Sequence, residues 1–246
     1  MKRVEKTVFI SYRRTNASWA LAISQSLTHS GFDVFLDYQG IASGDFERSI
    51  LENIRSRAHF LIVLTPSALA RCDDPCDWLR REIEEALETR RNIVPLMLEG
   101  FDFGTSAIAS KLTGKLAALK RYNGMTVSVE YFEAAMTKLH EKFLNVPLDA
   151  VLHQASGFAQ QAAKDQQTAA AAAPTVRQRE LTAQDWFEQG FNAVDDPDEA
   201  MRCNTEAIRL KPDYADAYYN RGIAHQDKGD RKAAQLDFDK AKLLRN

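Results

Sequence analysis

The sequence predicts an α/β domain built on a doubly wound parallel sheet, followed by a small all-helical region. Three observations support this prediction. Short runs of β-branched and aromatic residues alternate with helical stretches over residues 1–150, which is the pattern of parallel βαβ units. Alanine and glutamine then dominate residues 151–183, and residues 184–246 contain a near-repeat of helical hairpins. We therefore expect a sheet domain, a linker and two hairpins in these three ranges.

Five strands are expected in the sheet domain. They cover residues 7–11, 33–37, 59–64, 92–98 and, less clearly, a segment within 118–127. The third and fourth are almost entirely apolar, as expected for parallel strands covered on both faces. Between strands, residues 18–31 and 45–57 have apolar side chains at helical spacing, and Gly31 is expected to end the first helix. Because ligands bind beyond the carboxyl ends of such strands, we expect a site in the loops after the first three.

The two later segments differ from the sheet domain in composition. Alanine and glutamine favour helix, so part of the linker is expected to form a transient helix, which Pro174 interrupts. In the helical region, small residues recur where two helices must approach closely. The correspondences run from Trp186, Gly190, Ala200 and Ala207 to Tyr218, Gly222, Ala234 and Ala241.

This helical region resembles the tetratricopeptide (TPR) repeat family, although Asn204 stands where that family usually has a large apolar residue. Two repeats are fewer than the roughly three that such arrays need for independent stability. A plain pair of helical hairpins is the alternative. Either interpretation predicts contacts with a protein partner rather than chemistry.

Charge and composition exclude several functional classes. The 32 basic and 34 acidic residues give a formal charge of -2, so there is no overall attraction to nucleic acid or to an anionic membrane. The sequence has no run of about 18 apolar residues that suggests a membrane span, and its first residues do not resemble a signal peptide. Three cysteines favour reduced thiols and a cytoplasmic location. Cys72 and Cys76 lack the neighbouring ligands of a metal site, and idle thiols are favoured over redox-sensitive ones.

The most informative helix is predicted within residues 76–91, CDWLRREIEEALETRR. Asp74 and Pro75 are expected to provide its N-cap and first-turn proline. Because helical residues lie about 100° apart around the axis, one side of this helix is apolar and should be buried. The buried stripe comprises Leu79, Ile83, Ala86 and Leu87.

The four glutamates of this helix differ in direction. Glu84 and Glu88 lie opposite the buried stripe and are expected to face solvent in weak surface pairs. Glu85 is also expected toward solvent. Glu82 lies beside the stripe and close to Trp78, which precedes it by one helical turn. A carboxylate at the border of the core is partly desolvated, which strengthens its interaction with a developing positive charge.

Five motifs occur in order along the predicted sheet domain. They are FISYRR, GFDVFLD, YQGIASGDFE, LIVLTPSAL and DWLRREI. Together they resemble the TIR (Toll/interleukin-1 receptor) domain over about residues 5–145, and closely the NAD-hydrolysing kind found in bacteria and in the animal SARM proteins. The resemblance implies a flavodoxin-like five-stranded sheet of order 2-1-3-4-5. It also implies cleavage of NAD+ to nicotinamide and ADP-ribose or a cyclised product, with activation by association of neighbouring TIR domains.

The resemblance assigns the catalytic role to Glu82. In the family the glutamate of a W-x-x-x-E pattern is catalytic, and here that pattern falls on Trp78 and Glu82. The chemistry needs little more, because nicotinamide leaves as a neutral molecule and requires no general acid. The ribose passes through an oxocarbenium-like state, which a carboxylate stabilises. The ordinary alternative for a single glutamate is a solvated surface charge.

Other residues are expected to bind the substrate at the same site. An arginine after the first strand could pair with the pyrophosphate or stack on adenine, and Arg13 matches a substrate contact of the family. Gly44 and Phe46 match positions that close over the nicotinamide end. The predicted substrate-binding residues are Tyr12, Arg13, Arg14, Asp37, Gly44, Phe46 and Trp78.

Several of these assignments have alternatives. Phe46 could equally begin the core face of its helix, and Arg14 could belong to a solvated turn. Asp37 could cap the loop that it begins rather than contact a ligand. Gly40 and Ala42 depart from the SARM pattern, which has a lysine and a glutamate there, so the exact product is not predicted.

The sequence therefore predicts an NAD+ hydrolase of immune or stress signalling, activated by TIR self-association and bound to a protein partner through its helical repeats. NAD+ is expected as the substrate, without a further cofactor or a metal ion, and no nucleic acid or membrane partner is expected. The alternative is a non-catalytic TIR adaptor that recruits other TIR domains. A phosphoacceptor domain would need an acidic cluster after the first strand, where the sequence has arginines.

Overall fold

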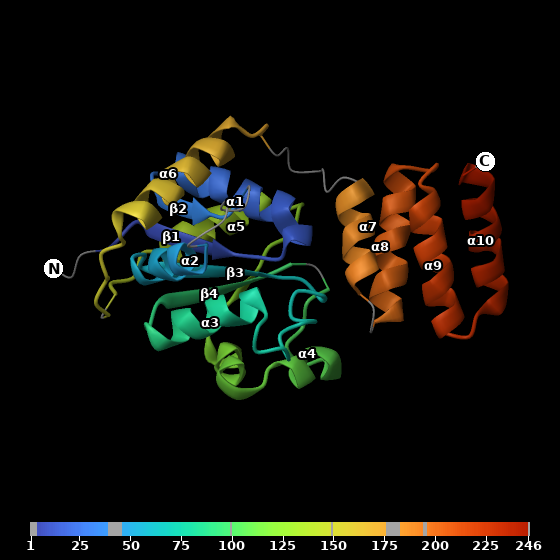
Figure 1. The fold of residues 1–246 in the computed structure, drawn as a ribbon, viewed down its shortest axis with the longest axis horizontal. Coiled ribbons are helices and arrows are strands. Elements are labelled where there is room, and N and C mark those ends of the chain that lie inside the picture. Colours follow the sequence, from blue (N-terminus) through green and yellow to red (C-terminus); the bar gives the residue numbers. More distant parts are fainter. Residues whose placement is uncertain are drawn as a thin grey trace. The chain divides into compact units, whose positions relative to one another are not determined.

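The chain folds into two compact units in the computed structural model (Figure 1). The first unit covers residues 1–179 and the second residues 180–246. The boundary lies near the end of the predicted linker, so most of that linker belongs to the first unit. The structure describes residues 4–38, 46–98, 100–148, 150–175, 183–193 and 196–245.

The first unit contains a five-stranded sheet in the predicted order, β2-β1-β3-β4-β5, and all neighbouring strands are parallel. The strands are β1 (Thr7–Ser11), β2 (Asp33–Leu36), β3 (His59–Leu64), β4 (Asn92–Met97) and β5 (Met125–Thr126). The first four agree closely with the predicted ranges. The fifth is shorter than predicted, because Gly114–Arg121 forms a 3₁₀ helix over the start of that segment.

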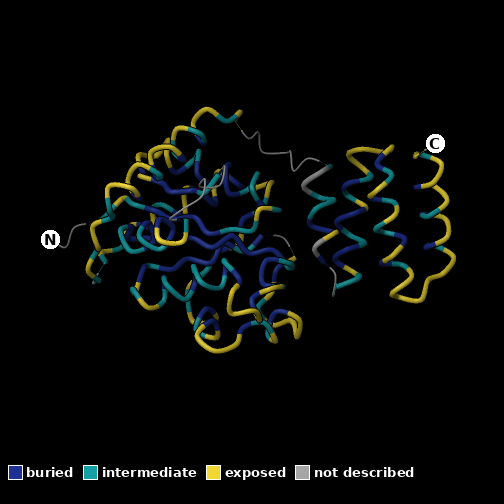
Figure 2. Tube along the Cα trace, in the orientation of Figure 1, coloured by how far each residue is buried: buried dark blue, intermediate teal, exposed yellow. Residues whose placement is uncertain are grey.

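Helices cover both faces of this sheet, as the apolar strands predict. Their bounds are α1 (Ala17–His29), α2 (Phe46–Arg55), α3 (Trp78–Glu88), α4 (Ser106–Lys111) and α5 (Phe132–Lys138). One apolar cluster joins α1 and α5 to one face of the sheet, and a second cluster joins α2 and α3 to the other. The strands are buried between these layers, while the outer helix faces are exposed (Figure 2). Among the described residues, no helix is long and apolar enough to cross a membrane.

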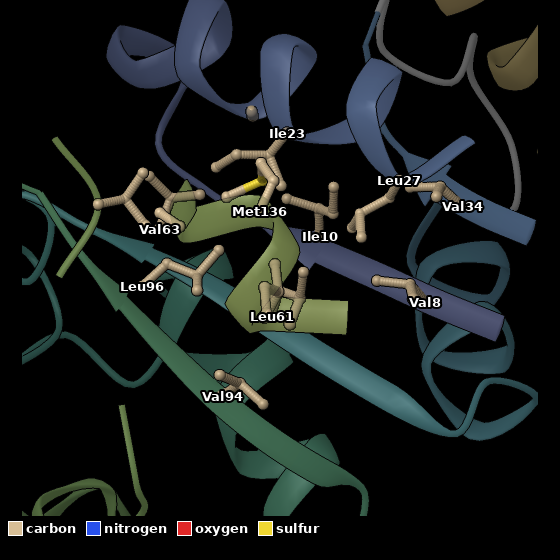
Figure 3. Close-up of a cluster of buried hydrophobic side chains, with 14 of the residues drawn as sticks. Val8, Ile10, Ile23, Leu27, Val34, Leu61, Val63, Val94, Leu96 and Met136 are labelled. Carbon is tan, nitrogen blue, oxygen red and sulfur yellow. The ribbon is translucent and has the colours of Figure 1, made fainter. Parts of the chain in front are cut away.

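Strand β1, which lies between β2 and β3, contributes side chains to both layers. Successive side chains of a strand point to opposite faces of the sheet. Val8 and Ile10 belong to the cluster with α1 and α5, whereas Phe9 belongs to the cluster with α2 and α3. Phe9 stacks between Phe35 and Phe60, with ring centroids 5.1 and 5.5 Å away. Figure 3 shows the first cluster, which also includes Ile23, Leu27, Val34, Leu61 and Met136.

The predicted linker contains a helix, α6 (Gly157–Ala172), that packs against α1, α2 and β2. Ala163 is only 6% exposed and joins the cluster of α2 and α3. The side-chain amide of Asn53, in α2, donates a hydrogen bond to the carbonyl of Ala159 at 3.1 Å. The expectation of a transient helix within a linker is therefore wrong for this stretch. Its small alanines let α6 approach α2 closely, so the helix is part of the first unit.

Both ends of α6 are defined by local sequence. Ser156 is the N-cap, and its hydroxyl accepts a hydrogen bond from the backbone N–H of Ala159. The helix ends at Ala172, shortly before Pro174, as predicted for a residue that cannot continue a helix. Along its length, the amide of Gln167 donates to the carbonyl of Val34 at 3.1 Å. Since β2 is an edge strand of the sheet, α6 anchors to that edge as well as to α2.

The second unit is all-helical, as predicted. Its helices are α7 (Ala183–Asn192), α8 (Pro197–Leu210), α9 (Ala215–Asp227) and α10 (Arg231–Arg245). A side chain at Gly222 would place its Cβ 2.6 Å from the ring of Phe238, and one at Gly190 would collide with Asn204. These glycines therefore allow the close helix approach that the repeat pattern indicated. Asn204 occupies in the first hairpin the place that Phe238 has in the second.

We predict that a charge on the buried side of α6 destabilises the first unit. In Ala163→Lys the ammonium would enter the apolar cluster, so we expect the free energy of unfolding to fall by about 2–4 kcal/mol. Ala171→Lys places the same group on an exposed position of the same helix, and we expect a change within about 0.5 kcal/mol. Urea denaturation of the full chain measures both. Equal stability of the two variants would contradict the packing of α6 on this unit.

Candidate active site

The ends of β1 and β2 and the start of α3 bring most of the predicted site residues together. β1 lies where the strand order reverses, between β2 and β3. Ser11 is the last residue of β1, and Tyr12 and Arg13 follow it. Asp37 directly follows β2, and Trp78 is the first residue of α3. This is the edge at which doubly wound sheets bind ligands.

Helix α3 begins later than predicted. Asp77 is its N-cap and accepts a hydrogen bond from the backbone N–H of Arg80 at 3.1 Å. The predicted capping residues, Asp74 and Pro75, are therefore wrong, and Asp74 instead accepts from the backbone N–H of Cys76 at 2.8 Å in the preceding turn. The predicted buried stripe is confirmed. It comprises the buried residues Leu79, Ile83 and Ala86, with Leu87 partly buried against the same cluster.

Three of the glutamates of α3 take part in ion pairs. Glu84 pairs with Arg80 at 2.9 Å, and Glu88 is exposed and pairs with a lysine, both as expected for surface groups. The prediction that Glu85 faces solvent is wrong. Its carboxylate pairs with Arg55 of α2 at 2.6 Å, and only 11% of its side chain is exposed. Helix α2 covers this side of α3, which the periodicity of one helix cannot reveal.

Glu82 is the glutamate of α3 whose side chain reaches the end of β1. The hydroxyl of Ser11 donates a hydrogen bond to Glu82 Oε2 at 2.5 Å. The residue keeps some exposed surface, yet protein atoms enclose its carboxyl group, and this burial raises its pKa from 4.5 to about 8. The carboxylates of Asp37 and Asp77 act in the same direction, whereas the Ser11 hydrogen bond and the charge of Arg13 oppose it. Such a displaced pKa beside strand ends is typical of a functional carboxyl group.

Trp78 joins the N-terminal ends of α2 and α3. Its ring meets that of Phe46 edge-on, with centroids 4.9 Å apart and planes at 83°. The guanidinium of Arg81 lies 4.6 Å from the Trp78 ring centroid and also pairs with Glu47. Phe46 packs against the core as well, in agreement with the alternative that it begins the core face of α2. A contact of Phe46 or Trp78 with nicotinamide stays a prediction.

Arg13 forms a buried ion pair with the N-cap of α3. Its guanidinium donates to both carboxylate oxygens of Asp77, at 2.6 and 2.8 Å, and to the carbonyl of Ala68 at 2.7 Å. Burial alone would raise the pKa of Asp77, but the hydrogen bonds and charge of Arg13 hold it below its ordinary value. Only 11% of the Arg13 side chain is exposed. These contacts fix the start of α3 beside β1, and a contact of Arg13 with substrate stays a prediction.

Tyr12, Arg14 and Asp37 form a second polar cluster at the strand ends. Arg14 donates to Asp37 Oδ2 at 2.7 Å and to the carbonyl of Tyr38 at 2.6 Å. The Tyr12 hydroxyl donates to the carbonyl of Asp37 at 2.8 Å, and burial raises the pKa of that hydroxyl. These contacts agree with a loop-capping role for Asp37. Arg14 keeps 54% of its side chain exposed, so a ligand can still reach its guanidinium.

Sequence reasoning overlooked two residues of this site. Ser11 had no assigned role, although the period of two along β1 places it on the face toward α3. Asp77 was overlooked because an aspartate and a proline just before it also form a good capping sequence. Of the other predicted residues, Gly44 lies outside the described residues, as do Gly40 and Ala42 in the same loop.

The thiols close to the site differ in exposure. Cys72 is buried, with its Sγ 3.5 Å from both Arg13 Nη2 and Asp77 Oδ1, and burial raises its pKa to about 12. A thiol with this pKa stays protonated and unreactive, which agrees with an idle structural cysteine. Cys76 is exposed. In the parts of the chain that the structure describes, no group of three or more His, Cys, Asp or Glu residues could hold a metal ion.

Comparison with known proteins identifies related domains in both units. The family described as "TIR domain" matches residues 8–128, and the family described as "TPR repeat" matches residues 197–229. The chain is 38% identical over 141 residues to NAD(+) hydrolase sarm1 of Drosophila melanogaster, a match that covers 56% of this chain and 10% of that protein.

Two further relatives carry similar names. The chain is 37% identical over 136 residues to NAD(+) hydrolase tir-1 of Caenorhabditis elegans, and 33% identical over 136 residues to NAD(+) hydrolase SARM1 of Danio rerio. Each match covers 54% of this chain, but only 14% and 18% of the two relatives. The chain therefore spans less than a fifth of the length of each of these three curated relatives.

We predict that Glu82 makes the stability of the first unit depend on pH. Because the folded-state pKa of Glu82 is raised to about 8, its stabilising contribution is complete below the ordinary value of 4.5 and is lost as the pH rises through 8. Glu82→Gln stays neutral and avoids this loss. At about pH 9 we expect the free energy of unfolding of the variant to be higher than that of the natural protein by on the order of 2 kcal/mol. At about pH 5 we expect a much smaller difference.

Urea denaturation at the two pH values measures this difference. Glu84→Gln is the matched control, since Glu84 belongs to the same helix and pairs with Arg80 at the surface. The prediction fails if Glu82→Gln and the natural protein keep the same stability difference at both pH values.

Proposed function

Residues 8–128 are a TIR domain, followed by a TPR repeat at residues 197–229. From this premise we propose that the protein cleaves NAD+, either by hydrolysis to nicotinamide and ADP-ribose or by cyclisation to nicotinamide and cyclic ADP-ribose. The observation that carries the proposal is the position of Glu82, one helical turn after Trp78 and hydrogen-bonded to the end of β1. The names of three relatives as NAD+ hydrolases support it for the matched domain.

The reaction suits a single carboxylate. The nicotinamide ring of NAD+ carries a positive charge and leaves as a neutral molecule, so cleavage of the glycosidic bond needs no proton donor. The positive charge then develops on the ribose in an oxocarbenium-like state. The ionised Glu82 stabilises that charge, and partial burial strengthens the interaction. Water adds to the anomeric carbon and loses a proton, which gives ADP-ribose.

The raised pKa of Glu82 has a direct consequence for this mechanism. Only the ionised carboxylate stabilises a cation, and a pKa of about 8 leaves most of the group protonated at neutral pH. A cationic nicotinamide ring placed beside it lowers that pKa, because an opposite charge favours the ionised form. Substrate binding therefore favours the protonation state that cleavage requires. No additional cofactor or metal ion is part of the proposal.

Other residues supply the substrate contacts in this proposal. The aromatic pair Phe46 and Trp78 suits the flat nicotinamide ring, and the exposed guanidinium of Arg14 suits a pyrophosphate. The proposal also includes self-association through the TIR domain and a protein partner that binds the repeats. The protein would act in immune or stress signalling in the cytoplasm. Phe191 and Tyr219 of the repeats are 62% and 44% exposed, which supports a protein-binding role for that unit.

We predict that the full chain, immobilised at high density to promote self-association, releases nicotinamide from NAD+. In Glu82→Gln the carboxylate that stabilises the oxocarbenium-like state is gone, so we expect release to fall by at least about a hundredfold. The rate of the natural protein should rise with pH as Glu82 ionises, with a midpoint at or below about 8. Chromatographic measurement of nicotinamide checks both expectations.

Glu84→Gln, on the same helix, serves as the control and should retain activity. Equal release by the natural protein and Glu82→Gln would remove Glu82 from the mechanism while leaving the activity. A complete lack of release at every surface density would overturn the proposed function and favour a TIR adaptor without catalysis.

A further inference from the structure

Ser11 is a polar residue at the end of the mainly apolar strand β1. The four residues before it are Thr7, Val8, Phe9 and Ile10, and Ser11 itself is only 1% exposed. Its neighbour across the sheet is Ile62 of β3. A buried hydroxyl costs free energy unless it finds a hydrogen-bond partner. The fold supplies that partner, because Ser11 faces the same side of the sheet as Phe9, where α3 packs.

The partner of Ser11 is the Glu82 carboxyl group. The Ser11 hydroxyl donates to Glu82 Oε2 at 2.5 Å. β1 is held on both sides by parallel neighbours, whereas the Glu82 side chain has several rotatable bonds. The hydrogen bond therefore ties the end of a flexible side chain to a strand that is paired on both sides.

The charged and titratable groups around Glu82 come from three elements. Arg13 follows β1, Asp37 follows β2, and Asp77 is the N-cap of α3. The charge of Glu82 also contributes to the raised pKa of the Tyr12 hydroxyl. The two aspartates disfavour the ionised form of Glu82. Arg13 favours it, but its guanidinium donates to Asp77 rather than to Glu82. The Tyr12 hydroxyl likewise donates elsewhere, to the carbonyl of Asp37.

We propose that Ser11 is a positioning residue that holds the Glu82 carboxylate toward the substrate and stabilises its ionised form. The inference rests on the proposed hydrolysis of NAD+. Within the described parts of the chain, Ser11 provides the direct side-chain hydrogen bond to Glu82. Donation to a carboxylate favours the charged state, so Ser11 offsets part of the cost of ionising Glu82 between two aspartates.

Two variants of the full chain separate this role from simple packing. Ser11→Ala removes the donor and leaves almost the same shape, and Ser11→Thr keeps the hydroxyl. Ser24→Ala is the matched control, because Ser24 is a serine of α1 that is also nearly buried, at 4% exposure, on the opposite side of the sheet. The carboxyl signals of ¹³C-labelled glutamate, followed by NMR through a pH titration, report the pKa of Glu82. Glu82→Gln identifies its signal.

In Ser11→Ala we expect the Glu82 titration to move to higher pH, while Ser11→Thr and Ser24→Ala leave it in place. In the nicotinamide assay, Ser11→Ala should lower kcat by about tenfold at neutral pH with little change in KM, and should shift the acidic limb of the pH–rate profile upward. An unchanged or lowered Glu82 titration in folded Ser11→Ala would overturn the proposal.

The two readouts distinguish failure of this inference from failure of the proposed function. If the natural protein releases no nicotinamide, the proposed hydrolysis fails, and the NMR titration still decides whether Ser11 stabilises ionised Glu82. If Ser11→Ala does not fold, Ser11→Cys takes its place, because a thiol is a weak donor of similar size. An upward shift of the Glu82 titration in Ser11→Cys supports the inference, and no shift contradicts it.

Discussion

The pairing of β1 with both of its neighbours is the constraint on which the site depends. Because side chains alternate along a strand, this pairing sends Val8 and Ile10 to the layer of α1 and α5. Phe9 and Ser11 then face α2 and α3. A shift of one residue in the register would exchange the two sets, burying Ser11 in the wrong layer and removing the hydrogen-bond partner of Glu82. The same stacking of Phe9 that builds the core therefore also determines where the site lies.

A second constraint acts at the start of α3. The ion pair between Arg13 and Asp77 joins the segment after β1 to the N-cap of the helix that carries Trp78 and Glu82. Three carboxyl groups, those of Asp37, Asp77 and Glu82, lie close enough here for the two aspartates to disfavour the ionised form of Glu82. Such local conflict is common at functional sites, where activity is retained at the expense of stability. Burial is the largest cause of the raised pKa of Glu82, and the charges of the two aspartates add to it.

Helix α6 extends the TIR fold beyond the sheet. It is anchored to α2 through Asn53 and to the edge strand through Gln167, so the chain that leaves the sheet domain first packs against the helix that carries Phe46. The repeats beyond it have their own close-packed helices, with glycines at the points of approach. The proposed NAD+ cleavage and the proposed partner binding thus fall on two units with separate cores, and α6 belongs to the first of them.

The sequence alone determined the first four strands, the helices between them, the apolar stripe of α3 and the special direction of Glu82, because these follow from local periodicity. The five ordered motifs added the sheet order and the family. Only the tertiary structure decided the partner of each charged group: Glu85 with Arg55, Arg13 with Asp77, and Ser11 with Glu82. It also decided that α6 is packed rather than a linker. The physical reason is the same in each case, since a hydrogen-bond or packing partner on a distant element leaves no periodic trace in the sequence.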